Sequence, residues 1–260
     1  MKETKDTLDV DIINVAGLLI DHGTDRLEGY LREKLNPRWM KTFAPAGLSS
    51  VLESPEDSIQ RTVDFVNESI PEIEAQFGQS RIVLLGGSNG GFTALLAACR
   101  LRFEKIFRVI AIEAPINPDV RVSPPGLMPH LHACVHHYGQ RPAFATEAVE
   151  TMRELGTGKV VVISNTHDDI VPPDAQRPVG DFDVIELSEG QGMSDVRLSG
   201  DRGSVVVLPK NIIGRGDGWR GRLPQGYRNH LAWSPEKYDL IMGIVGSALG
   251  KSAQEGEEAA

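Results

Sequence analysis

The feature that most constrains the fold is a glycine-rich turn with a serine at its centre. Residues 86–91 read Gly-Gly-Ser-Asn-Gly-Gly, follow a short apolar run at 82–85 and precede a helical pattern from about 90 to 102. A serine in a strand-to-helix turn needs small neighbours, because two backbones pass closely there. Such a turn also aims backbone N–H groups and the helix dipole at an oxygen that gains negative charge. The pattern makes Ser88 a candidate nucleophile.

A nucleotide-binding turn is the structural alternative for the same glycines. A P-loop needs a Lys followed by Ser or Thr after the glycines, and this chain has none there. A G-x-G-x-x-G frame cannot be placed through Ser88 either. We therefore favour the nucleophile interpretation.

The rest of the chain alternates apolar runs with helical patterns. Short runs at 12–20, 82–85, 109–112 and 160–163 are bounded by polar or turn residues, which is typical of buried parallel strands. A helix is expected to begin at Ser54, a capping residue, and to end at Gly78, with Pro71 kinking or splitting it. A last helix is expected over 235–249. This alternation predicts an α/β fold with a mostly parallel sheet and helices on both faces.

Composition excludes several function classes. The net charge of −9 argues against general affinity for nucleic acid. The two cysteines form neither a disulfide framework nor a zinc motif. We expect no membrane span, because no apolar stretch is long enough, and no cofactor. The charged first residues lack the features of a signal peptide, so a cytoplasmic location is expected, with a processed secreted chain as the alternative.

Two long segments break the alternation within the single domain expected over 1–260. Residues 117–150 are rich in Pro and His without a clean period and are expected to form a cap insertion. Residues 175–228 contain two strand-like runs, 182–187 and 204–208, and a segment rich in Gly and Arg. We expect them to form a hairpin and loop insertion near the site.

Four segments, which follow one another in the order typical of the family, resemble the α/β-hydrolase superfamily. More loosely, they resemble its carboxylesterase and lysophospholipase-like members. Residues 20–24 (IDHGT) are similar to the family's HG-containing turn, and residues 43–49 (FAPAGLS) to a second family turn. The turn around Ser88 is similar to the nucleophile elbow. Residues 160–172 (VVVISNTHDDIVP) are similar to the strand and turn that carry the catalytic acid.

The resemblance implies a three-layer α/β-hydrolase-like fold and a Ser-Asp-His triad in that chain order. It assigns the acid to Asp168, with Asp169 as the neighbour to test, and the base to His230, before the last helix. Backbone N–H groups of Asn89 and Thr24 would stabilise the oxyanion.

The chain departs from the family pattern in three ways. Few residues precede the first expected strand, so we expect a sheet reduced at the N-terminus. The 62 positions from Asp168 to His230 are about twice the family's usual spacing, which implies an inserted hairpin. Residue 87 is glycine, which leaves the elbow more open than in many members.

Weaker candidates lie in the two insertions. Arg215, Trp219 and Arg228 are candidate substrate-binding residues, although a solvated loop and simple packing are alternative interpretations. The histidines at 130, 132, 136 and 137 could share a face. Because supporting carboxylates are missing there, we favour a cap segment and expect no metal.

These residues predict a serine hydrolase that cleaves a carboxylic ester, thioester or lactone of a small or medium molecule through an acyl-enzyme. An acyltransferase using the same triad is one alternative, and a non-catalytic binding module on a hydrolase scaffold is another. The sequence specifies neither the acyl chain nor the oligomeric state.

Overall fold

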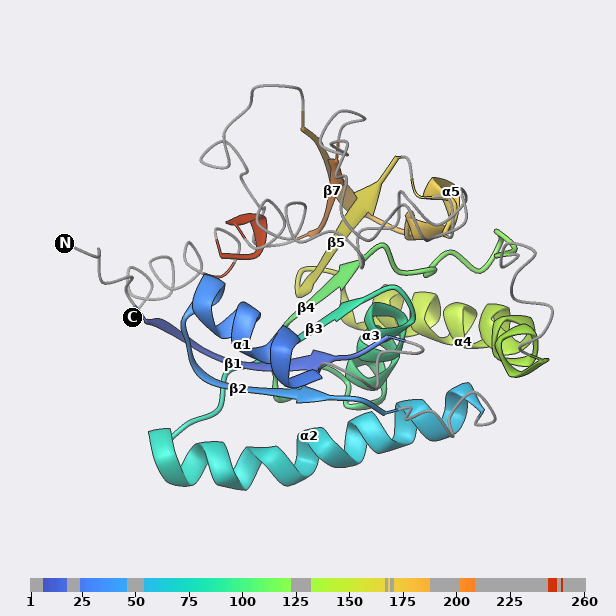
Figure 1. The fold of residues 1–260 in the computed structure, drawn as a ribbon. Coiled ribbons are helices and arrows are strands. Elements are labelled where there is room, and N and C mark those ends of the chain that lie inside the picture. The colour runs from blue at the N-terminus through green and yellow to red at the C-terminus, as the bar shows by residue number, and fades with distance from the viewer. Residues whose placement is uncertain are drawn as a thin grey trace.

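A computed structural model describes residues 7–17, 24–45, 54–122, 132–166, 168, 171–187, 202–208, 243–246 and 249. For residues 24–27 and 132–139 it describes the backbone alone. Its centre is a seven-stranded sheet in the order β2-β1-β3-β4-β5-β7-β6, in which every neighbouring pair is parallel (Figure 1). The strands are β1 (Leu8–Val15), β2 (Pro37–Phe43), β3 (Ile82–Gly87), β4 (Ile106–Ile112), β5 (Val160–Asn165), β6 (Phe182–Glu186) and β7 (Gly203–Leu208).

Helices cover both faces of this sheet. The described helices are α1 (Thr24–Leu35), α2 (Pro55–Phe77), α3 (Asn89–Arg100), α4 (His132–Leu155) and the four-residue α5 (Pro173–Gln176). Helices α2, α3 and α4 pack on one face. Helix α1 and the helical residues at 243–246, with Leu249, pack on the other. The expected α/β architecture, a parallel sheet between two layers of helices, is confirmed.

The two faces follow from the alternation of side chains along each strand. In β5, Val160 and Val162 join the core beneath α3 and α4, whereas Val161 and Ile163 join the core on the opposite face. The other central strands alternate in the same way. Because both faces are buried there, the central strands contain continuous apolar runs in the sequence.

Helix α2 begins and ends where its capping residues predict. The Ser54 hydroxyl accepts a hydrogen bond from the Asp57 backbone N–H at 3.2 Å, and Asp57 completes a capping box. Gly78 ends the helix in the left-handed conformation, with φ 79°. The helix runs through Pro71 unbroken, so the expectation of a split was wrong.

The expectation of a cap over 117–150 is wrong for its second half. This part belongs to α4, which packs on the sheet face with Ala145, Ala148, Val149 and Met152 in the core. The sequence hid this face because it is built partly from alanines and follows Pro142. Residues 123–131 lie outside the described residues.

The expected hairpin within 175–228 is also wrong. Both strand-like runs form strands, but β6 and β7 pair in parallel, and β7 lies between β5 and β6. Strand β7 is buried along its whole length, and β6 forms the edge of the sheet. The two runs extend the central sheet instead of forming a separate hairpin.

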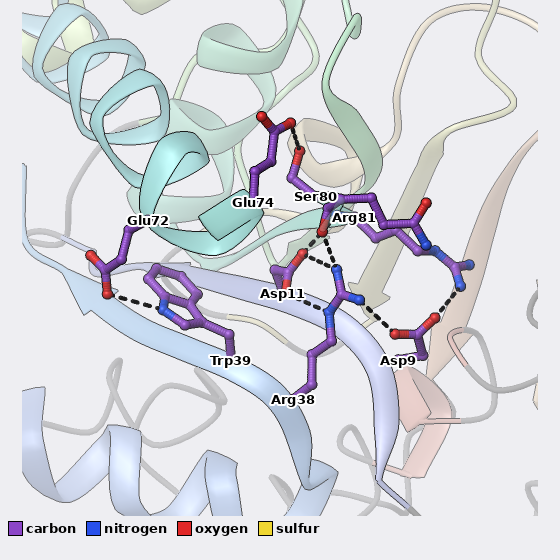
Figure 2. A network of polar contacts seen from close by, with 9 residues as sticks. Asp9, Asp11, Arg38, Trp39, Glu72, Glu74, Ser80 and Arg81 are labelled. Atoms are coloured by element: carbon purple, nitrogen blue, oxygen red, sulfur yellow. Dashed lines mark hydrogen bonds and ion pairs between the residues drawn. The ribbon is translucent and has the colours of Figure 1, made fainter. Parts of the chain in front are cut away.

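A buried ion pair between Asp11 and Arg38 joins β1 to β2 near their amino ends (Figure 2). Ser88 lies at the other end of the sheet, because it follows the carboxyl end of β3. The fully buried Asp11 carboxylate accepts two hydrogen bonds from the Arg38 guanidinium, at 2.8 Å each, and one from the Arg81 backbone N–H at 2.6 Å. Asp9 pairs with both arginines. This network holds the amino ends of β2 and β3 against β1.

Candidate active site

Ser88 lies in the turn between β3 and α3, with φ 54° and ψ −128°. A positive φ is uncommon for a residue other than glycine and costs about 1–3 kcal/mol. Neighbouring backbone holds this conformation: the Ser88 N–H donates to the Ile112 carbonyl at 2.7 Å, and the Ser88 carbonyl accepts from the N–H groups of Gly91 and Phe92. The side chain is half-buried. The turn therefore has the strained conformation expected of a nucleophile elbow.

The glycines two residues before and after Ser88 are sterically required. A Cβ at Gly86 would lie 2.5 Å from the Gly90 carbonyl carbon, and one at Gly90 would lie 2.2 Å from the Val15 carbonyl oxygen. Both contacts are with backbone, which cannot rotate away. The expectation that small residues let two backbones pass at this turn is confirmed.

The same contact places the end of β1 over the start of α3. Backbone atoms of Ala16 and Gly17 also lie within 3 Å of a Cβ at Gly90. The chain from here leads to the turn expected to supply one oxyanion N–H. Residues 20–23 of that turn, expected over 20–24, lie outside the described residues; Thr24 begins α1, and the position of its N–H relative to Ser88 stays a prediction. Asn89 is buried as the first residue of α3.

The sheet register brings the candidate acid to the same edge as Ser88. Gly87, Ile112 and Ile163 pair in one row across β3, β4 and β5. Ser88 and the turn carrying Asp168 therefore leave the same edge of the sheet two strands apart, with β5 extending two residues beyond this row, to Asn165. Asp169 and His167 lie outside the described residues.

The Asp168 carboxylate is buried and held at both oxygens. Its Oδ1 accepts from the Val171 backbone N–H at 3.0 Å, and its Oδ2 accepts from the Gln176 side-chain amide at 3.2 Å. The carboxylate of the predicted acid is therefore fixed within the turn that follows β5.

Glu113, Asn165 and Gln176 form a buried polar network that the sequence interpretation missed. Asn165 donates its amide to Glu113 at 2.7 Å, and its backbone N–H donates to the Gln176 side-chain oxygen at 2.8 Å. Glu113 follows β4 directly, with φ 50°, and its N–H donates to the Ile163 carbonyl. The only sign of this network in the sequence was Glu113, an acidic residue directly after the apolar run at 109–112. The network links the strand beside the elbow to the turn of Asp168.

Arg141 anchors the loop that follows β4. Its guanidinium is buried and donates to the carbonyls of Pro115, Asn117 and Val120. Asn117 in turn donates its backbone N–H to the Ala175 carbonyl of α5 at 2.9 Å. The loop and α5 therefore form one packed unit next to the turn of Asp168.

The remaining predicted site residues lie outside the described part of the chain. These are His230, Arg215, Trp219 and Arg228. The side chains of the clustered histidines are not described either. Among the side chains that are described, no group of three or more His, Cys, Asp or Glu could hold a metal ion. Within the same residues, no helix has the length and apolar character needed to cross a membrane.

Comparison with solved structures identifies the fold. An esterase from the fungus Rhizomucor miehei superposes with a TM-score of 0.60 at 14% identity, covering 100% of this chain and 78% of its own. Carboxyl esterase 2 from Tuber melanosporum gives 0.55 at 11% identity, with 93% and 78% covered. Est1E from Butyrivibrio proteoclasticus gives 0.52 at 14% identity, with 98% and 90% covered.

No protein-family model and no curated protein sequence matches the chain. The structural likeness, together with the parallel sheet and the strained turn at Ser88, shows that the chain has an α/β-hydrolase fold.

Proposed function

We propose that this protein is a serine hydrolase that cleaves a carboxylic ester of a small or medium molecule through an acyl-enzyme. The observation that carries the proposal is the conformation of Ser88, held at φ 54° between glycines that tolerate no Cβ. Strain of this kind persists where the surrounding structure maintains it, and it clusters at active sites. The superposed proteins from Rhizomucor miehei and Tuber melanosporum are esterases, which supports the same reaction class.

In the proposed mechanism, Ser88 attacks the acyl carbonyl while His230 removes its proton. His230 then protonates the leaving alcohol, and a water molecule hydrolyses the acyl-enzyme by the same route. Asp168 holds the imidazole tautomer and stabilises the imidazolium. The Asn89 N–H, at the amino end of α3, and the Thr24 N–H would stabilise the oxyanion, each contributing roughly 3–4 kcal/mol. A thioester or lactone would react through the same steps.

Pre-steady-state kinetics on a p-nitrophenyl ester test this proposal. An acyl-enzyme that forms faster than it breaks down gives a burst of p-nitrophenol equal to the concentration of active sites. We expect Ser88→Ala to lose both the burst and the steady-state rate while keeping the wild-type circular dichroism spectrum. A Ser88→Ala variant with an undiminished burst would refute the proposal.

A further inference from the structure

Three oxygen atoms of the turn that carries Asp168 surround the side-chain nitrogen of Gln176. These are the Asn165 carbonyl, the Asp168 Oδ2 and the Val171 carbonyl, which lie 3.4, 3.2 and 2.6 Å from the Gln176 Nε2. Converging oxygens repel one another unless a donor stands between them. The Gln176 NH₂ group, which has two hydrogens and no acceptor, is that donor.

The orientation of the Gln176 amide is fixed by its other end. Its Oε1 accepts the Asn165 backbone N–H at 2.8 Å. Rotating the amide by 180° would place Oε1 against the three oxygens and Nε2 against a donor. Only one orientation therefore satisfies the site, and in that orientation an N–H points at the Asp168 carboxylate.

The backbone of Gln176 is held as firmly as its side chain. The short helix α5 begins at Pro173, and the Gln176 N–H donates to the Pro172 carbonyl at 3.3 Å. Asn117 contacts α5 through two hydrogen bonds, to the carbonyls of Asp174 and Ala175. The side chain of Gln176 is fully buried. The Gln176 side-chain amide therefore extends from a backbone that is itself held by hydrogen bonds.

We propose that Gln176 is a positioning residue for the catalytic acid: its side-chain amide fixes the orientation of the Asp168 carboxylate toward the base. This inference rests on the proposed function, since it presupposes that Asp168 acts on an imidazole. Without the amide, Oδ2 loses a donor and the carboxylate turns away from the other oxygens. Misplacement of a catalytic group by about 1 Å can cost about 10²-fold in rate.

The test compares Gln176→Leu with a matched control. Gln60→Leu makes the same chemical change at an exposed amide of α2, which donates to the Asp64 carboxylate at 2.8 Å. Active sites in each protein are titrated with a fluorophosphonate until labelling is complete, so that kcat is expressed per labelled site and unfolded protein is not counted. We expect Gln176→Leu to lower kcat roughly 10- to 100-fold with KM within about twofold of wild type, and Gln60→Leu to change neither.

A second variant keeps the test decisive if Gln176→Leu yields no labelled sites. Gln176→Met preserves the length of the side chain but has no N–H to donate to Asp168. Its kcat per labelled site should fall by a similar factor. Wild-type kcat in either variant would overturn the positioning role while leaving the proposed function intact. A wild-type protein that neither labels nor turns over ester would instead refute the proposed function.

Discussion

The carbonyl oxygen of Val15 lies directly above Gly90, where an added Cβ would stand only 2.2 Å away. Val15 ends β1, and Gly90 is in the first turn of the helix that follows Ser88. This contact joins the elbow to the strand that leads toward the predicted oxyanion turn. The conformation of Ser88 therefore depends on Gly90, a residue with no reactive side chain.

Substitution of Gly90 should damage the site and the fold together. We expect Gly90→Ala to destabilise the protein by about 1–3 kcal/mol, because backbone must move to admit the methyl group, and to reduce ester turnover strongly. Gly29→Ala is the control: Gly29 lies in α1 with nothing within 4 Å of an added Cβ. It should stabilise the protein by roughly 0.5–1 kcal/mol. Urea titration and esterase assays measure both effects, and a fully active Gly90→Ala would contradict the steric account.

The acid can be assigned by comparing amide substitutions. Asp168→Asn should lower kcat about 10⁴-fold, because an amide favours the wrong imidazole tautomer, whereas Asp169→Asn should have a small effect. Steady-state assays at one pH are sufficient. Full activity in Asp168→Asn, combined with an inactive Glu113→Gln, would move the acid from the turn after β5 to the end of β4.

The pH dependence of turnover tests His230. A general base must be neutral to accept the Ser88 proton, so kcat/KM should rise with pH through an apparent pKa of about 6–7 and then level off. His230→Ala should remove nearly all turnover, whereas His22→Ala should lose much less, since His22 is expected to act through its backbone. If His230→Ala were active and His22→Ala or His167→Ala inactive, the base would lie elsewhere.

The ion pair between Asp11 and Arg38 should contribute to stability and not to catalysis. Arg38→Ala leaves the fully buried Asp11 carboxylate without its guanidinium, which should cost about 3–5 kcal/mol of unfolding free energy. Arg102→Ala removes an exposed pair with Glu154 and should leave the melting temperature nearly unchanged. Turnover per labelled site should equal the wild-type value in both. A lower kcat in Arg38→Ala would mean that this end of the sheet influences the site.

The sequence predicted β3, β4 and β5 well, since burial on both faces gives them continuous apolar runs. The first strand, β1, begins and ends earlier than the run expected at 12–20. The sequence did not predict β2, where Arg38 and Lys41 interrupt the apolar residues. The sequence also could not show that β6 and β7 are parallel, because side chains alternate in the same way in parallel and antiparallel pairs. Helix α4 was missed because Pro142 and small residues obscure its period.

Within the site, the sequence revealed residues that stand in short local motifs but not contacts between residues far apart in the chain. Ser88 and Asp168 stand in short motifs whose chemistry can be read from neighbouring residues. Glu113 meets Asn165 across 52 positions of sequence, and nothing near either residue signals the contact. Gln176 is only eight positions from Asp168, but its role depends on the fold of the intervening turn.

The most direct measurement of the central claim is covalent labelling with a fluorophosphonate probe, followed by peptide mapping. This probe modifies an activated serine hydroxyl and leaves ordinary serines unchanged. We predict one label per chain, located on Ser88, with labelling and ester turnover lost in parallel and both absent in Ser88→Ala. An esterase-active protein that carries its label on another serine, or that stays unlabelled at Ser88, would contradict the account.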